Sequence, residues 1–414
     1  MKILLVFPFL PYPPDDGGRI GFFNPIKYLS REHEVSVVCL TDGNQPESSM
    51  NVQKLKGYCA ELRTFQRSRW QDPHRLLRGM VGQPPGSAAK YWYPAAGELI
   101  RETIRANRPD LVEFHHLNTA IYRNFTGNVP AVLRDHNVEY KVWERFAEHA
   151  QGLTEKTYAR WSAPRVRSYE AEMCTRFDRC VVVSDADAAH LRAVAPQARI
   201  DVIASGVDTE YFCPVPDAPE EPLSMTLTGS FEWRPRQQSL LILLTEIFPR
   251  LRARVPEAKL YVIGKGVPEH LHRVAHDIPG VTIVGRVPDV RPYIARSALL
   301  IHYLESGGGI ALKVLEAMAM RKPVLCNSLG CEGIPARHGT DIFVADGPEN
   351  FASAAAYLLQ NEAVRRAIAE NAYRVALEKY SWKRVASQFN CCYGQVLEER
   401  GARNNLAVMR AESL

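Results

Sequence analysis

Short apolar runs alternate with longer amphipathic stretches along most of the chain, which predicts strands separated by helices. In the first half, the predicted strands are residues 3–7, 35–40, 111–114, 131–133, 180–183 and 200–203. A loop over residues 8–18 and a helix that ends near Leu29 separate the first two of them. Because strands joined by crossover helices run parallel, we expect a doubly wound parallel sheet.

A second series of the same kind follows, with predicted strands at residues 225–228, 260–263, 282–284, 299–301 and 323–325. Between the two series, prolines and turn residues accumulate over residues 203–222 and the periodicity stops. The pattern predicts an α/β protein of two Rossmann-like domains, residues 1–205 and residues 206–384. Helices over about residues 385–414 are expected to cross back and complete the first domain.

The length and composition agree with this organisation. A chain of 414 residues is too long for one ordinary core, and its composition of 46% hydrophobic and 23% charged residues is typical of a soluble globular protein. The net charge of +5 is too weak to indicate nucleic acid, but it suits a polyanionic ligand or an anionic membrane surface. The apolar run at residues 2–10 stops at prolines, so we expect neither a signal peptide nor a membrane helix. The nine cysteines lack paired spacing, which indicates reduced thiols and a cytoplasmic location.

The most specific chemistry lies in residues 305–325, where a glycine loop, a helix start and an apolar strand follow one another. Glycines at 307–309 permit a tight turn that leaves the N–H groups of the following helix start free to bind an anion. Lys313 and Glu316 lie three residues apart on one helix face, where a lysine suits phosphate oxygens and a carboxylate suits ribose hydroxyls. This spacing predicts a nucleoside diphosphate site. The alternative is an ordinary loop followed by a solvated ion pair, and the run is neither a Walker loop nor a dinucleotide fingerprint.

A second group of candidates lies at the strand ends of the first domain, where α/β sheets place their chemistry. Gly17 and Gly18, in the loop after the first strand, permit close approach of a ligand. Three histidines follow two predicted strands: His115, His116 and His136. Asp135 and Glu139 are placed to orient these rings or to act on an acceptor hydroxyl, and the sequence does not choose between the two roles.

Taken together, these motifs resemble the retaining GT-B glycosyltransferases of glycosyltransferase family 4. The segments that carry the resemblance are residues 203–212, 229–235, 285–293 and 307–317. It implies two Rossmann-like domains facing across a cleft and a nucleotide-sugar donor, with no further cofactor and no metal. The chain departs from the family at Gly308, where the first of two glutamates is common, and at Ala311, where one branch often has arginine. Arg236 replaces a frequent asparagine, and we hypothesise that it restores the missing positive charge.

The resemblance also implies roles for individual residues. His116 would lie next to the transferred sugar with His136 close by, and Lys313 and Glu316 would act on the donor. The positions implied to bind the donor are Gly17, Gly18, Arg234, Arg236, Gly264, Arg286, Val287, Gly308, Gly309, Ile310, Lys313 and Glu316.

These features predict an enzyme that moves a hexose-type sugar from a nucleoside diphosphate sugar to an acceptor hydroxyl in exopolysaccharide or other glycoconjugate synthesis. We expect a UDP-sugar in preference to a GDP-sugar, although the side chains of residues 285–287 do not themselves select the base. The acceptor is expected to be a sugar, a lipid-linked molecule or another hydroxyl compound. Two alternatives stay open: a non-catalytic GT-B protein that binds nucleotide or glycan for a partner, and a sugar-nucleotide epimerase.

Residues 63–80 interleave arginines with Phe65, Trp70 and Leu77. Such a pattern suits peripheral docking on anionic lipid at the inner face of the membrane. The alternative is a solvated helix face or a plain connection.

Overall fold

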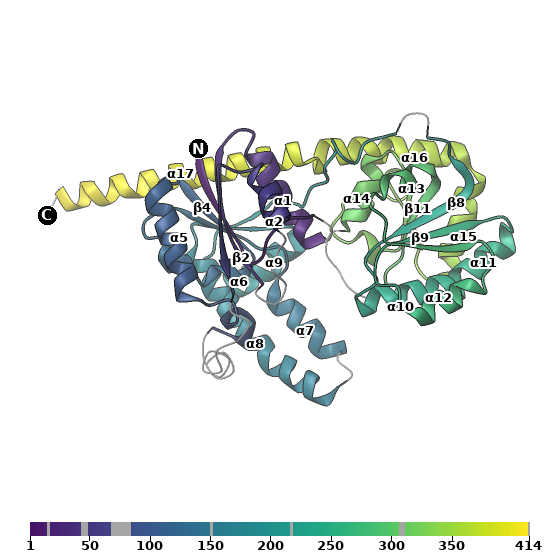
Figure 1. Cartoon of the computed structure of the whole chain (residues 1–414), viewed down its shortest axis with the longest axis horizontal. Coiled ribbons are helices and arrows are strands. Elements are labelled where there is room, and N and C mark those ends of the chain that lie inside the picture. Colours follow the sequence, from purple (N-terminus) through teal and green to yellow (C-terminus); the bar gives the residue numbers. More distant parts are fainter. Residues whose placement is uncertain are drawn as a thin grey trace. The chain divides into compact units, whose positions relative to one another are not determined.

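The computed structural model describes residues 1–14, 17–42, 49–67, 84–149, 152–215, 218–305 and 311–412. These residues form two compact units, one of residues 1–204 with 386–414 and one of residues 205–385 (Figure 1). Three predicted donor residues, Gly308, Gly309 and Ile310, lie outside the described residues, as does most of the 63–80 segment.

Unit 1 contains a parallel sheet of seven strands in the order β3-β2-β1-β4-β5-β6-β7. The strands are β1 Lys2–Phe7, β2 Glu34–Thr41, β3 Glu61–Gln66, β4 Leu111–His115, β5 Ala131–Arg134, β6 Arg179–Val182 and β7 Ile200–Val202. The inner strands β1, β4 and β5 are buried along almost their whole length, as expected for strands covered by helices on both faces.

The helices of unit 1 connect these strands. They are α1 Gly17–Leu29, α2 Ser49–Lys56, α4 Gly86–Ala89, α5 Pro94–Asn107, α6 Leu117–Ala120, α7 Glu139–His149, α8 Leu153–Arg176 and α9 Asp185–Val194. A short 3-10 turn, Arg123–Phe125, follows α6. Helix α5 illustrates why these segments are helical. Pro94 occupies its first turn, and its buried residues Ala96, Ile100 and Thr103 share one face. Helix α1 begins at Gly17, so Gly17 and Gly18 form its first turn rather than the end of a loop.

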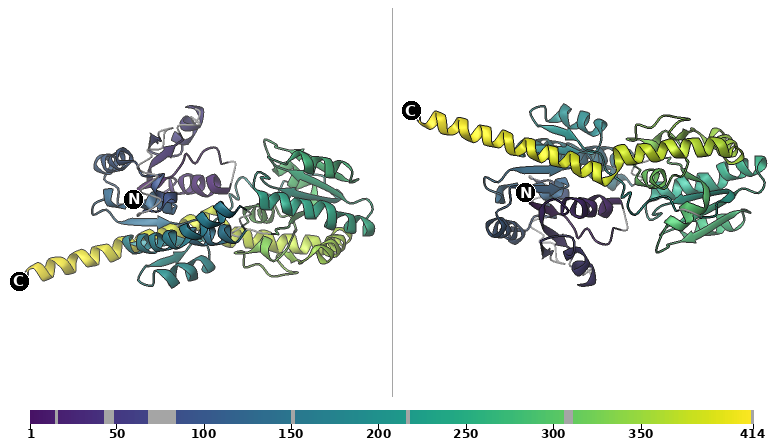
Figure 2. Two further views of the ribbon diagram at one scale, coloured as in Figure 1. Left: turned by 90° about the horizontal axis from the view of Figure 1, so that it is seen from below. Right: turned by 90° about the horizontal axis from the view of Figure 1, so that it is seen from above.

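The C-terminal part of α17 (Trp382–Glu412) belongs to unit 1. Asn390 Oδ1 accepts a hydrogen bond from His33 Nε2 at 2.8 Å, and Tyr393 donates to buried Glu113. Glu399 pairs with Arg179 at 2.8 Å. Figure 2 shows this helix, in yellow, lying along the elements of unit 1 in both views.

Unit 2 contains a second parallel sheet, of six strands in the order β10-β9-β8-β11-β12-β13. The strands are β8 Glu221–Thr228, β9 Lys259–Ile263, β10 Val281–Gly285, β11 Ser297–His302, β12 Val324–Cys326 and β13 Phe343–Val344. Its helices are α10 Arg234–Ile242, α11 Phe248–Arg254, α12 Glu269–His276, α13 Arg291–Arg296, α14 Leu312–Ala319, α15 Pro348–Gln360 and α16 Glu362–Val375. Short turns of other helical types span Leu243–Ile247, Leu329–Cys331 and Ala376–Tyr380.

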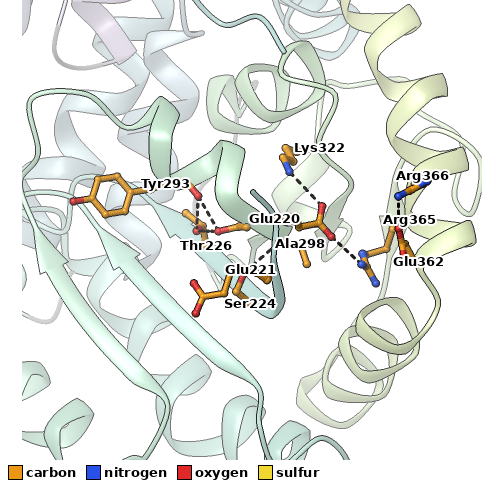
Figure 3. A network of polar contacts seen from close by, with 11 residues as sticks. Glu220, Glu221, Ser224, Thr226, Tyr293, Ala298, Lys322, Glu362, Arg365 and Arg366 are labelled. Carbon is orange, nitrogen blue, oxygen red and sulfur yellow. Dashed lines mark hydrogen bonds and ion pairs between the residues drawn. The ribbon is translucent and has the colours of Figure 1, made fainter. Parts of the chain in front are cut away.

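A polar network fixes the amino-terminal side of this sheet (Figure 3). Glu220, just before β8, accepts from Arg365 of α16 at 3.0 Å and from Lys322 at 3.4 Å. Within the sheet, the Ser224 hydroxyl accepts from the Ala298 N–H at 3.3 Å, which ties β8 to β11. The network therefore anchors one edge of the central strands, and the opposite, carboxyl edge is left for the site.

The predicted fold class, two doubly wound parallel sheets, is confirmed. Among the helices of the described ranges, none has the length and apolar composition that crossing a membrane requires.

Candidate functional site

Two glycines form the floor of the carboxyl edge of the unit 2 sheet. Gly229 follows β8 and Gly264 follows β9, and a Cβ on Gly264 would lie 1.5 Å from the Gly229 carbonyl oxygen. Gly264 also has a φ of +148°, a conformation that only glycine adopts readily. The Gly264 N–H donates to the Gly285 carbonyl at 2.8 Å. The ends of β8, β9 and β10 are thus held together backbone against backbone.

Lys313, on the first turn of α14, reaches this floor. A Cβ on Gly229 would lie 3.4 Å from Lys313 Cε, so the lysine side chain passes directly over the end of β8. The side chain is half-buried. Burial, together with the charge of Arg236, lowers the pKa of Lys313, and the charge of Glu316 acts in the opposite direction. The ammonium group therefore lies where a bound anion would be strongly favoured.

Glu316, one turn along α14, is 9% exposed. Burial raises the pKa of its carboxyl group, and the nearby charge of Lys313 opposes that shift. Within the described residues, no ion pair joins Lys313 to Glu316. The alternative of a solvated pair on a helix surface is therefore wrong, since both side chains turn inward.

Arg236 of α10 contacts His302 at the end of β11, with Nη1 3.3 Å from Nε2 of the ring. Burial lowers the pKa of Arg236 to about 10. The pKa of His302 is well below its usual value, because the ring is buried and faces the charges of Arg236 and Lys313. Two cations and a neutral imidazole therefore converge on this edge. His302 was missed as a site residue, although a polar residue closing the apolar run at 298–302 was an available signal.

Side chains from neighbouring elements hold the residues that enter the glycine loop. Asn327 accepts from the Leu304 N–H at 3.0 Å and from the Gly330 N–H at 3.1 Å, and its amide donates to the Leu304 carbonyl. The Ser239 hydroxyl accepts from the Glu305 N–H at 3.0 Å. These anchors depend on tertiary contacts, and no local sequence pattern indicates them.

Two further predicted donor residues, Arg234 and Arg286, lie at the same edge but are more exposed to solvent. Arg234 is exposed on the first turn of α10, directly after the β8 loop. Arg286 and Val287 follow Gly285, which has a φ of +80°, and Arg286 is exposed. The structure brings Lys313, Glu316 and Arg236 together, whereas Arg234 and Arg286 lie at the rim.

In unit 1, His116 caps the short helix α6 after β4. It has a φ of +75°, which is unusual for a residue with a side chain, and its Nδ1 accepts from the Asn118 N–H at 3.3 Å. Its Nε2 lies 3.2 Å from Glu139 Oε1 at the start of α7. A strained backbone held by two contacts fixes the ring in one orientation, as in many functional sites.

His136 lies at the end of a buried chain of polar groups. Glu113 accepts from Tyr393 and lies 2.9 Å from His115 Nε2, and His115 Nδ1 lies 3.4 Å from His136 Nε2. If Glu113 accepts from His115 Nε2–H, the neutral His115 accepts from His136, leaving His136 Nδ1 as an acceptor. That atom faces α1, where a Cβ on Gly21 would lie 3.4 Å away.

The protonation of His136 follows from its surroundings. Burial and the charges of Arg134, His115 and His116 hold the pKa of His136 well below its usual value. The ring is therefore neutral near pH 7, and its Nδ1 can accept a hydrogen bond. Gly17 and Gly18 are exposed on the first turn of α1, one turn before Gly21.

A buried carboxyl pair beneath this site predicts a pH-dependent stability. Burial raises the pKa of both Asp135 and Glu170; the charge of Glu170 adds to the shift of Asp135, and the charge of Glu139 adds to that of Glu170. The folded protein therefore holds a proton that the unfolded chain releases, and the stabilisation present at low pH is lost as the pH rises. We expect the free energy of unfolding, measured in urea, to fall between about pH 5 and pH 8.

Asp135→Asn keeps the acceptor for the Leu117 N–H, 3.1 Å away, but removes one titrating group, so it should flatten that slope. The exposed Asp277→Asn is the control and should leave the slope intact. An unchanged slope in Asp135→Asn would show that the pair does not share a proton.

No group of three or more histidine, cysteine, aspartate or glutamate side chains in the described ranges is arranged to hold a metal ion.

The fold and the sequence matches together define the class of protein. Residues 22–211 match the family described as Glycosyltransferase Family 4, and residues 223–361 match the family described as Glycosyl transferases group 1. The chain is a glycosyltransferase of the GT-B type. Its two halves carry the paired domains of these glycosyltransferase families.

Solved structures share the fold along nearly the whole chain. HepE of Anabaena, crystallised with UDP and glucose, is 14% identical, with a TM-score of 0.67 over 95% of this chain and 100% of HepE. Sucrose-phosphate synthase from Thermosynechococcus elongatus is 17% identical, with a TM-score of 0.69 over 96% of this chain and 100% of the synthase.

Among curated proteins, an uncharacterised 44.6 kDa protein in the cps region of Klebsiella pneumoniae is 21% identical over 93% of this chain and 98% of its own length.

Proposed function

We propose that the protein transfers a hexose-type sugar from a UDP-sugar to an acceptor hydroxyl, with retention of configuration, in exopolysaccharide or other glycoconjugate synthesis. The observation that carries the proposal is the convergence of two cations: Lys313 lies over Gly229, and Arg236, whose charge acts on Lys313, contacts His302 at the end of the neighbouring strand β11. Two partly desolvated cations on a glycine-lined strand edge suit two linked phosphates better than any neutral ligand.

The chemistry follows from where charge develops. As the bond between sugar and diphosphate breaks, negative charge grows on the departing phosphate oxygens, and Lys313 and Arg236 are fixed in place to stabilise it. Arg234 at the rim adds a third cation. Because side chains supply this positive charge, we propose that transfer needs no metal. Glu316, buried one turn further along α14, is placed to accept hydrogen bonds from ribose hydroxyls.

We propose that His116 contacts the transferred sugar and that His136 contacts the acceptor hydroxyl. His116 is held by Glu139, and His136 is neutral with an acceptor nitrogen facing Gly21. A neutral imidazole can accept a hydrogen bond from an acceptor hydroxyl and so orient that oxygen for attack. Glu139 would act by holding His116 in position.

The relatives support the choice of donor and product class. HepE was crystallised with UDP and glucose, and also with UDP-glucose. The Klebsiella relative is named for a cps region, and the structural neighbour WaaG is described as a glycosyltransferase involved in lipopolysaccharide biosynthesis. UDP-sugars and glycan acceptors are therefore the first compounds to try.

The test begins with binding and ends with chemistry. A panel of nucleoside diphosphates should raise the melting temperature, with UDP stronger than GDP, because a ligand of the native state stabilises it. Purified protein, given UDP-sugars and glycan or lipid-linked acceptors in EDTA, should form product whose anomeric NMR signals show retention. Binding without hydrolysis or transfer across the panel would indicate a non-catalytic protein, and a new sugar nucleotide formed without acceptor would indicate an epimerase.

Arg236→Ala should weaken UDP binding about tenfold, because it removes a charge-assisted contact from a partly buried site. Isothermal titration at low and moderate salt would measure the effect, which should be larger at low salt. Arg366→Ala removes an exposed arginine of the same unit and is the control. Unchanged affinity at both salt concentrations would show that Arg236 does not compensate for Ala311.

A further inference from the structure

Five large hydrophobic side chains are exposed on one helical hairpin of unit 1, formed by α7 and α8. They are Val142, Phe146, Leu153, Tyr158 and Trp161. Across the described residues, fourteen such side chains are exposed, so more than a third of them lie within residues 142–161. Leu153, the first residue of α8, is 82% exposed. Apolar side chains gathered in this way mark an interaction surface.

The aromatic rings of this surface form a continuous row across both helices. Ring centroids are 6.2 Å apart for Phe146 and Trp143, 5.7 Å for Trp143 and Tyr158, and 6.2 Å for Tyr158 and Trp161. Arg165 lies over the Trp161 ring at 4.2 Å. The rings therefore form one continuous surface with a cation at its end. We call Trp143, Phe146, Tyr158 and Trp161 the aromatic row.

The charges around the aromatic row are mainly positive. Residues 141–167 contain six lysines and arginines and three glutamates, one of which, Glu144, is paired with Lys141 at 2.8 Å. A second copy of this chain would present the same basic face, so self-association through it would bring like charges together. An anionic partner fits, and aromatic rings among cations are typical of proteins that lie at the membrane interface.

The hairpin links this surface to the candidate acceptor residues. Figure 1 shows α7 and α8 projecting from the sheet of unit 1 as an antiparallel pair. At its base, Glu170 of α8 accepts from the N–H groups of Glu139 and Tyr140, each at 2.9 Å. Glu139 in turn contacts His116. The hairpin that carries the exposed apolar side chains is therefore in direct contact with His116 through Glu139.

We propose that the α7–α8 hairpin docks on an anionic membrane, with Phe146, Leu153 and Trp161 entering the boundary between headgroups and acyl chains while the surrounding cations bind lipid phosphates. This surface is distinct from residues 63–80. It deepens the proposed function and rests on it in one respect, because docking would present a lipid-linked acceptor to unit 1.

Flotation of the full-length protein with vesicles tests the proposal. The protein should float with vesicles that mix phosphatidylglycerol into phosphatidylcholine, and flotation should weaken with pure phosphatidylcholine and with added salt. Phe146→Ser combined with Leu153→Ser should lower the partition coefficient about tenfold, because two exposed apolar side chains no longer enter the lipid. Met50→Ser, which replaces another exposed side chain of unit 1, should float like the wild type.

Two kinds of result would contradict the docking proposal. No flotation of the wild type, or equal flotation of the double variant, would overturn the assignment of this surface. A wild-type dimer in sedimentation that the double variant abolishes would also overturn it and identify a second copy as the occupant.

Thermal stabilisation by UDP, measured on the same samples, separates docking from donor binding. The double variant should retain that stabilisation, since its substitutions lie on the hairpin, and this also shows that it folds. Normal flotation without any response to UDP would count against the proposed function and leave the docking surface intact.

Discussion

Lys313→Ala is expected to lower kcat about tenfold to a hundredfold or more while the protein stays folded. A charge-assisted hydrogen bond is typically worth about 1.5 to 3 kcal/mol, and each 1.36 kcal/mol of lost transition-state stabilisation corresponds to a factor of about ten in rate. The loss should appear in kcat because the phosphate charge grows as the sugar departs. Steady-state kinetics with a UDP-sugar would measure it, with the melting temperature recorded alongside.

Lys322→Ala is a matched control, because Lys322 is a half-buried lysine of the same unit that pairs with Glu220 just before β8, at the opposite edge of the sheet. It should keep near-wild-type kcat. Glu316→Ala belongs in the same experiment and should impair donor use without unfolding the protein. Wild-type turnover in Lys313→Ala would refute the assigned diphosphate site.

Gly264→Ala is expected to lower the free energy of unfolding by about 3 kcal/mol or more. The new Cβ would meet the Gly229 carbonyl oxygen at 1.5 Å, a contact that side-chain motion cannot relieve, and the φ of +148° strains any residue with a side chain. Because the Gly229 carbonyl is a main-chain group that cannot rotate away, the clash must push apart the ends of β8 and β9. Urea unfolding monitored by circular dichroism would measure the loss, and failure to obtain soluble protein would agree with it.

Gly394→Ala provides the comparison, since Gly394 lies within α17 and a Cβ there meets nothing within 4 Å. Alanine is favoured over glycine inside a helix, so this variant should be neutral or more stable by about 0.5–1 kcal/mol. If Gly264→Ala unfolds as the wild type does, the close packing of the two turns is wrong.

Much of the fold follows from the sequence because buried parallel strands are continuous apolar runs. Two strands escaped prediction for physical reasons. β3 is an edge strand with alternating half-exposed positions that include Arg63, so its residues resembled a basic amphipathic segment. β13 has only two residues, too few to form a pattern.

The candidate site was predictable where spacing along one element decides it and hidden where tertiary contacts do. Lys313 and Glu316 share a helix face, so their proximity could be predicted. The contact of Arg236 with His302 joins α10 to the end of β11, and the Gly229–Gly264 contact joins two loops. Such pairs are distant in sequence and have no local signature. His115 was noted, but its link to Tyr393 spans most of the chain.

That link has a practical meaning for anyone who shortens the protein. Tyr393 begins the chain of buried groups that ends at His136, and it is contributed by the last helix. A stop codon upstream of position 393 would delete a buried donor and leave the Glu113 carboxylate short of one partner beneath the histidines of the candidate site. Deletions that look like removal of a dispensable tail would thereby alter the imidazoles more than a hundred residues distant in the primary structure.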